Sequence, residues 1–223
     1  MPLNLPSRSL FLARFLTYRF LGLLLALLDL LIASPFFGNY LLDRAAHAAL
    51  LAILLFATVV AASTAHHVRW IAATLATASG IVIFAGLVLE HRVIYVPVLA
   101  LFTIYLAYTI GVVLRRMVTT AQIDADILCG AVAIYFLIGV VWAMTYWLIY
   151  EFDKGAFAAV PSLARPPYSF HHFLYYSFDS LTTLGIGDIT PVNRFAQIWT
   201  TLETATGNLY IAVLVARLVS LYR

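Results

Sequence analysis

Seven consecutive residues have the types and spacing that could bind a dehydrated cation: Thr-Thr-Leu-Gly-Ile-Gly-Asp at residues 182–188. Gly185 and Gly187 can adopt backbone angles that are closed to other residues, so the carbonyl oxygens of successive residues can turn toward one axis. Together with the Thr183 hydroxyl, those oxygens could replace the hydration shell of a monovalent cation. The predicted ion-binding residues are Thr183, Leu184, Gly185, Ile186 and Gly187.

A short helix is expected to position this segment. Residues 168–182 would extend about 22 Å as a helix at 1.5 Å per residue, which is too short to cross a membrane. They follow Arg165-Pro166-Pro167, a natural helix start, and they run into a Gly-x-Gly that continues a helix poorly. A half-helix followed by irregular backbone is tolerated at membrane depth only inside protein or beside a water-filled cavity. The sequence therefore predicts a re-entrant loop beside a polar pathway.

The composition is that of a membrane protein. Of the 223 residues, 64% are hydrophobic and 10% are charged, and the mean hydropathy is +0.98, whereas about a quarter of the residues in a soluble domain are charged. At roughly 20 apolar residues per span, the chain has room for about six crossings. We expect an all-α membrane protein with six transmembrane helices at residues 18–37, 45–64, 70–89, 93–114, 127–150 and 196–221.

The basic residues favour one orientation of these helices. Six spans put both termini on one side, and with cytoplasmic termini eight basic residues lie inside and five outside, as the positive-inside rule prefers. The eight are Arg8, Arg14, Arg19, Arg69, Arg115, Arg116, Arg217 and Arg223, and the five are Arg44, Arg92, Lys154, Arg165 and Arg194. We expect a multi-pass protein of the inner (plasma) membrane with both termini in the cytoplasm.

Other classes of function find little support. The basic residues are scattered rather than gathered on one face, so no nucleic acid is expected as a partner. Cys129 is the one cysteine, which leaves no intrachain disulfide and no thiolate metal site. The predicted spans carry no Ser/His/Asp, His-Glu-x-x-His or paired-carboxylate arrangement. We therefore expect a protein that is not an enzyme and has no cofactor.

Residues 182–188 resemble the selectivity filter of tetrameric potassium channels, which usually reads Thr-Val-Gly-Tyr-Gly-Asp. The resemblance covers residues 127–222, as outer helix, pore helix, filter and inner helix, and looks most like the bacterial two-helix pore module. It implies a homotetramer in membrane lipid, with a pore domain at residues 123–223 and a four-helix N-terminal transmembrane domain at residues 1–122. The residues implied to bind K⁺ are Thr183, Leu184, Gly185 and Ile186.

One residue departs from the family pattern. Ile186 stands where Tyr or Phe is usual, and it removes an aromatic hydrogen bond that would brace the filter from behind. Related channels tolerate an aliphatic residue there, so the resemblance implies potassium selectivity that is less rigidly enforced. The alternative is a weakly selective or non-selective monovalent cation channel. A transporter of the potassium-uptake kind is disfavoured because such proteins carry four filter-like loops in one chain, and this sequence has one.

The resemblance also assigns supporting roles near the filter. In some bacterial relatives a Glu stands at the position of Asp179 and shares a proton or water with the Asp of the filter. The resemblance therefore implies that Asp179 pairs with Asp188 here. The alternative is that backbone or solvent holds the Asp179 carboxylate. Tyr175 and Tyr176 would pack as an aromatic cuff around the filter or anchor the helix at the membrane interface, and Thr182 would support the filter from the end of the pore helix.

The inner helix carries the remaining candidate residues. Gly207 matches a hinge glycine of the family, although close packing on the pore helix would equally require a small residue. Glu203 is ionisable and lies inside a span, so it has either a structural bond to the pore-helix region or an electrostatic role near the ion path. One face would line the cavity and the inner gate, where an apolar constriction can close by dewetting. That face holds Asn208, Ile211, Val215 and Val219.

The first four helices are not expected to sense voltage. A voltage sensor needs basic residues at regular positions along its fourth helix, whereas this one has Arg92 at its start and Arg115 and Arg116 at its end. His171 and His172, near the external mouth, form either an interfacial pair or a pH sensor. No soluble ligand-binding domain is expected after the last helix, so the sequence does not identify a gating stimulus.

Overall fold

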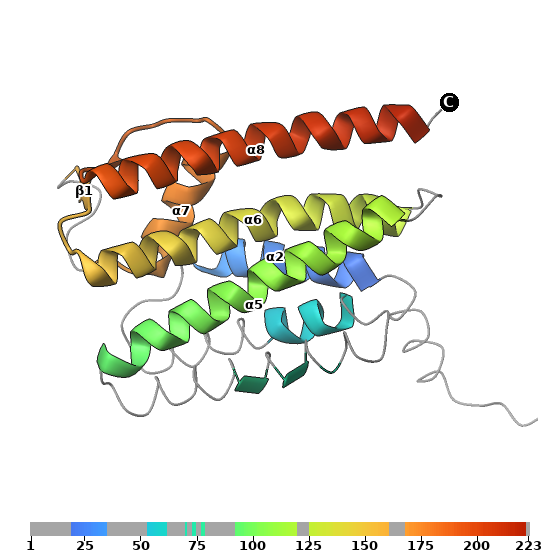
Figure 1. Cartoon of the computed structure of the whole chain (residues 1–223), viewed down its shortest axis with the longest axis horizontal. Helices are drawn as coiled ribbons and strands as arrows, with labels where there is room; N and C mark the ends of the chain where they lie inside the picture. Colours follow the sequence, from blue (N-terminus) through green and yellow to red (C-terminus); the bar gives the residue numbers. More distant parts are fainter. Residues whose placement is uncertain are drawn as a thin grey trace, which may run out of the picture.

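The computed structural model describes residues 19–34, 53–61, 70, 73–74, 77–78, 92–119, 125–160 and 168–221. Its helices are α2 (Arg19–Ala33), α5 (Arg92–Thr119), α6 (Ala125–Phe152), α7 (Phe170–Leu181) and α8 (Arg194–Leu221), and its strands are β1 (Phe157–Ala159) and β2 (Ile189–Pro191). Residues 53–61 are also helical. The long helices lie side by side, and the short α7 fits between α6 and α8 at one end (Figure 1). The mostly helical class predicted from the sequence is confirmed for the described residues.

The described helices lie on the predicted apolar runs, and their ends differ by a few residues. α5 is longer than predicted and α7 is shorter, with 12 residues. The predicted third helix, residues 70–89, falls almost wholly outside the described residues, as does about half of the second, residues 45–64. The basic residues outside the described part of the chain are Arg8, Arg14, Arg44, Arg69, Arg165 and Arg223.

Two helices in the described part of the chain are long and apolar enough to cross a membrane. They are Leu99–Met117, within α5, and Ala125–Phe152, which is α6. α8 has 28 residues, about 42 Å at 1.5 Å per residue, but Arg194, Glu203 and Arg217 make it less apolar. Length and composition thus support a membrane protein, and the number of crossings stays a prediction.

One hydrophobic core joins the described N-terminal helices to α6 and α7. α2 and α5 both pack along α6, and the core includes Phe20, Tyr105, Ile134 and Leu181, each 2% exposed or less. The predicted domain boundary at residue 122 lies outside the described residues, and the core is continuous across it. The described N-terminal helices therefore pack on the α6 of their own chain.

The start of α2 is fixed to the start of α6 by a carboxylate. Asp126 Oδ1 accepts the backbone N–H groups of Phe20 and Leu21 at 3.0 and 3.2 Å. The first N–H groups of a helix have no partner within the helix, so Asp126 caps α2 from a neighbouring element. The Arg116 guanidinium lies over the Phe20 ring, 5.0 Å from its centroid, and brings the last turn of α5 to the same point.

A glycine lets α7 approach α6 closely. A Cβ built on Gly139 would lie 2.7 Å from the Phe178 ring, whereas a Cβ on Gly111 would have no atom within 4 Å. The contact at Gly139 thus leaves no room for a methyl group. Gly111, which is exposed on α5, is a matched position without that constraint.

Gly139→Ala should destabilise the protein by about 1–3 kcal/mol, because the added methyl group overpacks the contact between α6 and α7. Gly111→Ala is the control, and it should be neutral or stabilise by up to about 1 kcal/mol, since alanine favours a helix more than glycine does. Thermal melting of both variants in the same detergent measures the difference. Equal melting temperatures would contradict the close packing at Gly139.

Candidate functional site

α7 brings the predicted filter segment, residues 182–188, to one face of the chain. The helix packs against both α6 and α8, and its buried residues include Phe173, Ser177 and Leu181. It ends where the Thr182 N–H donates to Phe178 O and the Thr183 N–H donates to Ser180 O, both at 3.1 Å. The chain then leaves the helix and runs along the surface as irregular backbone (Figure 1).

The backbone of the filter segment alternates in handedness. Thr183, Gly185 and Gly187 have φ values of 59°, 65° and 79°, and the residues between them do not have positive φ. Alternation of this kind turns successive N–H groups toward one side and successive carbonyl oxygens toward the other. Gly185 and Gly187 adopt positive φ easily, whereas Thr183 is a β-branched residue held at an unfavourable angle that costs about 1–3 kcal/mol.

The N–H side of the segment is bound to the last turn of α7, mainly to Asp179. The N–H groups of Leu184 and Gly185 donate to the Asp179 carbonyl oxygen at 2.9 and 3.4 Å. The Ile186 N–H donates to the Asp179 carboxylate, at 2.9 Å from Oδ1. Asp179 is 6% exposed. One buried residue therefore fixes three consecutive peptide groups of the segment.

The carbonyl oxygens of residues 183–186 form the other side of the segment. Within the described part of the chain, no hydrogen bond reaches the carbonyl oxygens of residues 183–186, and these residues are exposed. The Thr183 hydroxyl donates to Thr182 O at 2.6 Å, and the Thr182 hydroxyl donates to Phe178 O at 2.6 Å. The arrangement leaves a row of carbonyl oxygens free to act as cation ligands.

The outer end of the segment is anchored by Asp188 and a small sheet. Asp188 accepts the Tyr175 hydroxyl and the Ile189 N–H, both at 2.9 Å. β2 pairs antiparallel with β1, with Ala158 opposite Thr190, and the Val160 N–H donates to Asp188 O at 2.9 Å. The sequence did not predict this sheet, because two three-residue strands are too short to give an alternating pattern.

The two carboxylates of the site have separate partners. Asp179 holds the Ile186 N–H, Asp188 holds Tyr175 and Ile189, and no hydrogen bond joins the two carboxylates in the described structure. This geometry agrees with the alternative prediction, in which a backbone group binds the Asp179 carboxylate. Sharing of a proton or water between Asp179 and Asp188 stays a prediction.

Tyr175 and Tyr176 point in different directions and have different roles. Tyr176 is buried, its ring lies 5.0 Å from that of Tyr146, and its hydroxyl lies 2.7 Å from Thr200 Oγ1 on α8. Tyr175 is 41% exposed and contacts Asp188. Partial burial and the Asp188 carboxylate raise the pKa of Tyr175 to about 12, so its hydroxyl remains the donor.

Glu203 is completely buried between three helices. Its carboxyl oxygens lie 2.5 Å from the Ser177 hydroxyl of α7 and 2.5 Å from the Tyr146 hydroxyl of α6. These contacts match the alternative of a structural bond to the pore-helix region. Sequence reasoning missed Ser177 and Tyr146 because they lie 26 and 57 positions away, and no local spacing marks them.

α8 lies directly against the end of α7. A Cβ on Gly207 would be 2.4 Å from the Leu181 carbonyl oxygen, so a small residue is required there for packing. A hinge at Gly207 stays a prediction. The predicted cavity face is exposed in the single chain: it comprises Asn208, Ile211, Val215 and Val219, and its three aliphatic side chains are between 46% and 59% exposed.

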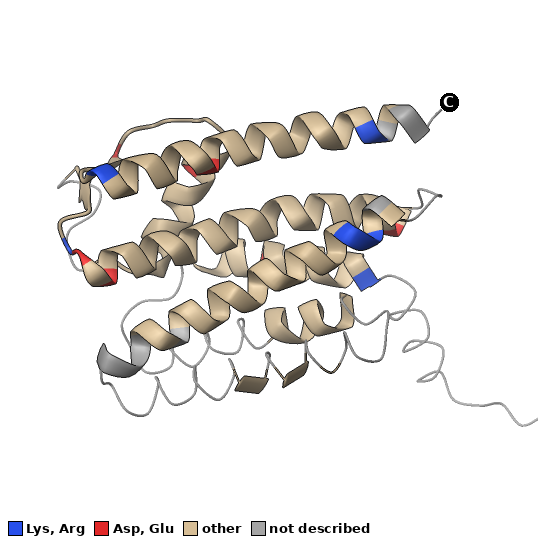
Figure 2. Cartoon of the chain, in the orientation of Figure 1, with Lys and Arg blue, Asp and Glu red and all other residues tan. Residues whose placement is uncertain are grey.

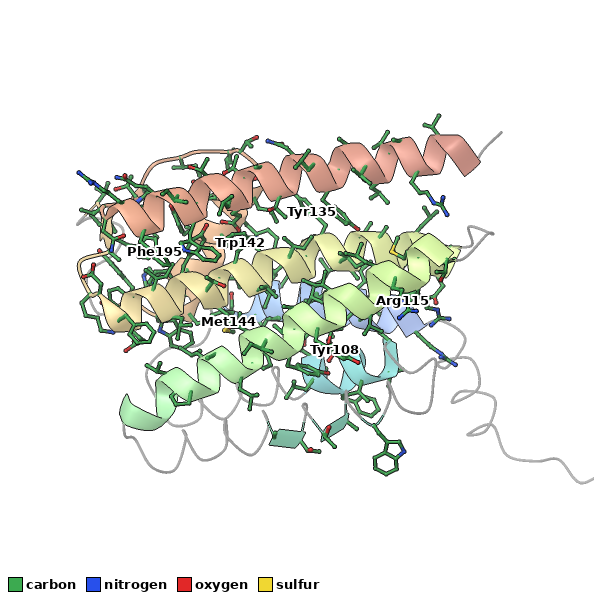
Figure 3. The ribbon with its side chains drawn as sticks, viewed as in Figure 1. Tyr108, Arg115, Tyr135, Trp142, Met144 and Phe195 are labelled. Carbon is green, nitrogen blue, oxygen red and sulfur yellow. The ribbon has the colours of Figure 1, made fainter. Side chains whose placement is uncertain are left out.

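Aromatic residues of α6 fill the space between α6 and α8 (Figure 3). Tyr135 lies with its ring 6.0 Å from Tyr210, and its hydroxyl reaches Leu181 O at 3.4 Å. Further along α6, the Trp142 ring lies 5.5 Å from the Trp199 ring. These contacts support α7 and α8 from behind the filter segment.

The histidine pair lies at the start of α7 and is tied to Ser169. The two rings stack with centroids 3.8 Å apart, and Nδ1 of His171 and of His172 lie 2.6 and 2.9 Å from Ser169 Oγ. The Ser169 N–H also donates to His172 Nδ1 at 3.2 Å. Burial, with His171 beside it, lowers the pKa of His172 to about 4, and burial lowers the pKa of His171. The pair is therefore neutral at physiological pH.

Acidification should weaken the fold through this pair. Between pH 6.5 and about 4, the unfolded chain binds a proton at His172 and the folded chain does not, so the stability present above pH 6.5 declines as the pH falls. His172→Gln should reduce that decline in melting temperature between about pH 7.5 and about pH 5. An identical decline in the variant would show that His172 does not contribute to it.

Residues 126–223 match the family model described as an ion channel. No curated protein and no solved structure matches the chain. The matched residues begin in the first turn of α6 and include α7, the filter segment and α8, so they contain the whole site described above. This part of the chain is therefore similar to an ion channel domain.

Proposed function

We propose that four copies of this chain form a potassium-selective channel, in which K⁺ is the transported substrate and the carbonyl oxygens of residues 183–186 form the filter. One observation carries the proposal. The filter backbone has alternating positive φ, its N–H groups are bound from behind, and its carbonyl oxygens have no donor within the described residues. Carbonyl oxygens arranged in this way can replace the hydration shell of a passing ion.

The geometry of one chain supports an assembly around an axis. A single filter segment can coordinate an ion from one side only, whereas four identical segments would surround it. α7 ends at the filter, and the negative end of its dipole adds to the attraction for a cation. No cofactor is needed for this function, and K⁺ itself is the bound ion.

The exposed surface of α8 supports the same assembly. Its exposed residues include Leu202, Leu209, Ile211 and Val213, each at least 46% exposed. Apolar surface of this extent is normally covered by a partner or by lipid. In the proposed tetramer, three identical subunits cover part of it, and Ile211, Val215 and Val219 form the apolar constriction of the inner gate.

The distribution of charge supports cytoplasmic termini. The described basic residues of α2, of the last turns of α5 and of the C-terminal part of α8 lie at one end of the helices (Figure 2). They are Arg19, Arg115, Arg116 and Arg217. Basic residues favour the cytoplasmic side of a membrane. We propose that this end faces the cytoplasm and that the protein lies in the plasma membrane.

A weakly selective cation channel is the second candidate function. The Ile186 side chain is 56% exposed and has no hydrogen-bonding group with which to brace the filter. The Ile186 N–H, however, is held by Asp179, and this bond braces the backbone without an aromatic side chain. The proposal therefore favours selectivity.

The reversal potential of the purified protein in planar bilayers, under opposed K⁺ and Na⁺ gradients, tests the proposal. It should lie near the K⁺ equilibrium potential, and external barium should block the current. Gly185→Ala should move it toward zero, because a Cβ at positive φ costs about 1–2 kcal/mol in each subunit. Gly111→Ala is the control. A reversal near zero in the unmodified protein would favour the second candidate function.

Asp179→Ala should weaken selectivity, because the Ile186 N–H loses its acceptor at a cost of about 1–3 kcal/mol per subunit. The Na⁺ permeability relative to K⁺ should rise on the order of tenfold, since about 1.4 kcal/mol corresponds to a factor of ten. Asp179→Asn keeps an acceptor oxygen at Oδ1 and should stay close to the unmodified protein. If both variants lose selectivity equally, the negative charge or a proton shared with Asp188 is what matters.

A further inference from the structure

Glu203 belongs to a hydrogen-bond network, a series of short contacts between oxygen atoms. Its Oε2 lies 2.5 Å from the Tyr146 hydroxyl, and its Oε1 lies 2.5 Å from Ser177 Oγ. Ser177 Oγ in turn lies 2.7 Å from the Gly139 carbonyl oxygen. The network thus leads from α6 to α8, then to α7 and back to α6.

The protons in the three contacts of this network can be counted. Each of the three contacts is short enough to require a hydrogen atom between its oxygens. Tyr146 and Ser177 supply one hydroxyl proton each, and the Gly139 carbonyl supplies none. Two protons cannot serve three contacts, so the third must come from the Glu203 carboxyl group.

The surroundings of Glu203 do not favour a charge. Among the described residues, the ionisable side chains that interact with it are the tyrosines Tyr146 and Tyr135 of α6 and Tyr176 of α7, and none of these is a cation. The residue is 0% exposed. An ionised carboxylate that is buried without a cationic partner is strongly disfavoured.

We propose that Glu203 is a neutral carboxylic acid that donates from Oε1 to Ser177 Oγ and thereby positions α7 between α6 and α8. Tyr146 then donates to Glu203 Oε2, and Ser177 donates to Gly139 O, so each of the three contacts in the network has one proton. Glu203 is a positioning residue for the pore helix and adds no negative charge near the ion path. Its consequence for selectivity rests on the proposed function, whereas its protonation does not.

Infrared spectroscopy of the full-length protein at neutral pH tests the protonation directly. A protonated carboxyl group has a carbonyl stretch above the amide I band, and this stretch moves to lower frequency in D₂O. The unmodified protein should show such a band, and Glu203→Gln should remove it. Glu151→Gln is the matched control, because Glu151 pairs with Lys154 at 2.7 Å and should contribute no such band.

The functional readout uses conservative variants in the same bilayer experiment. The side-chain amide introduced by Glu203→Gln can donate to Ser177 and accept from Tyr146, so this variant should keep the relative permeability of the unmodified protein. Glu203→Asp has a shorter side chain that cannot reach both partners, and its relative Na⁺ permeability should rise. A band that persists in Glu203→Gln, the absence of any band in the unmodified protein, or misfolding of Glu203→Gln would each overturn the proposal. A channel without K⁺ selectivity would overturn the proposed function and leave the infrared result unaffected.

Discussion

The hydrogen bonds of Asp179 to the filter backbone are the constraint on which the site depends. Irregular backbone in an apolar surrounding needs a partner for every N–H group, and Asp179 supplies acceptors for the N–H groups of residues 184, 185 and 186. Once these groups are held on one side, the alternating backbone directs the carbonyl oxygens to the other. The directions of these carbonyl oxygens are therefore set by Asp179 on the opposite side of the segment, and the side chains of Leu184 and Ile186 have little part in them.

The same constraint explains why the surrounding elements are packed so closely. Asp179 can hold the filter only if α7 itself is fixed, and α7 has contacts on each side. Gly139 and Gly207 allow α6 and α8 to approach it, and the buried aromatic rings around Tyr146, Phe157 and Tyr176 connect it to β1. The β1–β2 sheet fixes the strand beyond Asp188. Thr183, at an unfavourable φ, is thus held between two anchored ends.

The sequence predicts the parts of this arrangement that depend on local pattern. Apolar runs locate the described helices because hydropathy is a property of neighbouring residues. Gly185 and Gly187 locate the filter segment because their backbone freedom is a property of single residues. The partners of Asp179 and Glu203 are different in kind. They depend on how α6, α7 and α8 pack, and Ser177 and Tyr146 have no spacing that points to Glu203. The opposite directions of Tyr175 and Tyr176 likewise follow from the packing of α7, which buries one face and exposes the other.

The position of α6 limits how the described N-terminal helices can influence α7 and α8. α6 packs against α2 and α5 as well as against α7 and α8, so it connects the described N-terminal helices to both later helices. At one end, Asp126 binds α6 to the start of α2. In the middle of α6 and toward its other end, the Gly139 carbonyl oxygen accepts from Ser177 of α7, and the Tyr146 hydroxyl contacts Glu203 of α8. Because α6 is a single continuous helix between these points, one element joins the start of α2 to α7. The face of α8 that carries Ile211 and Val215 is exposed in the single chain, so the described N-terminal helices leave it uncovered.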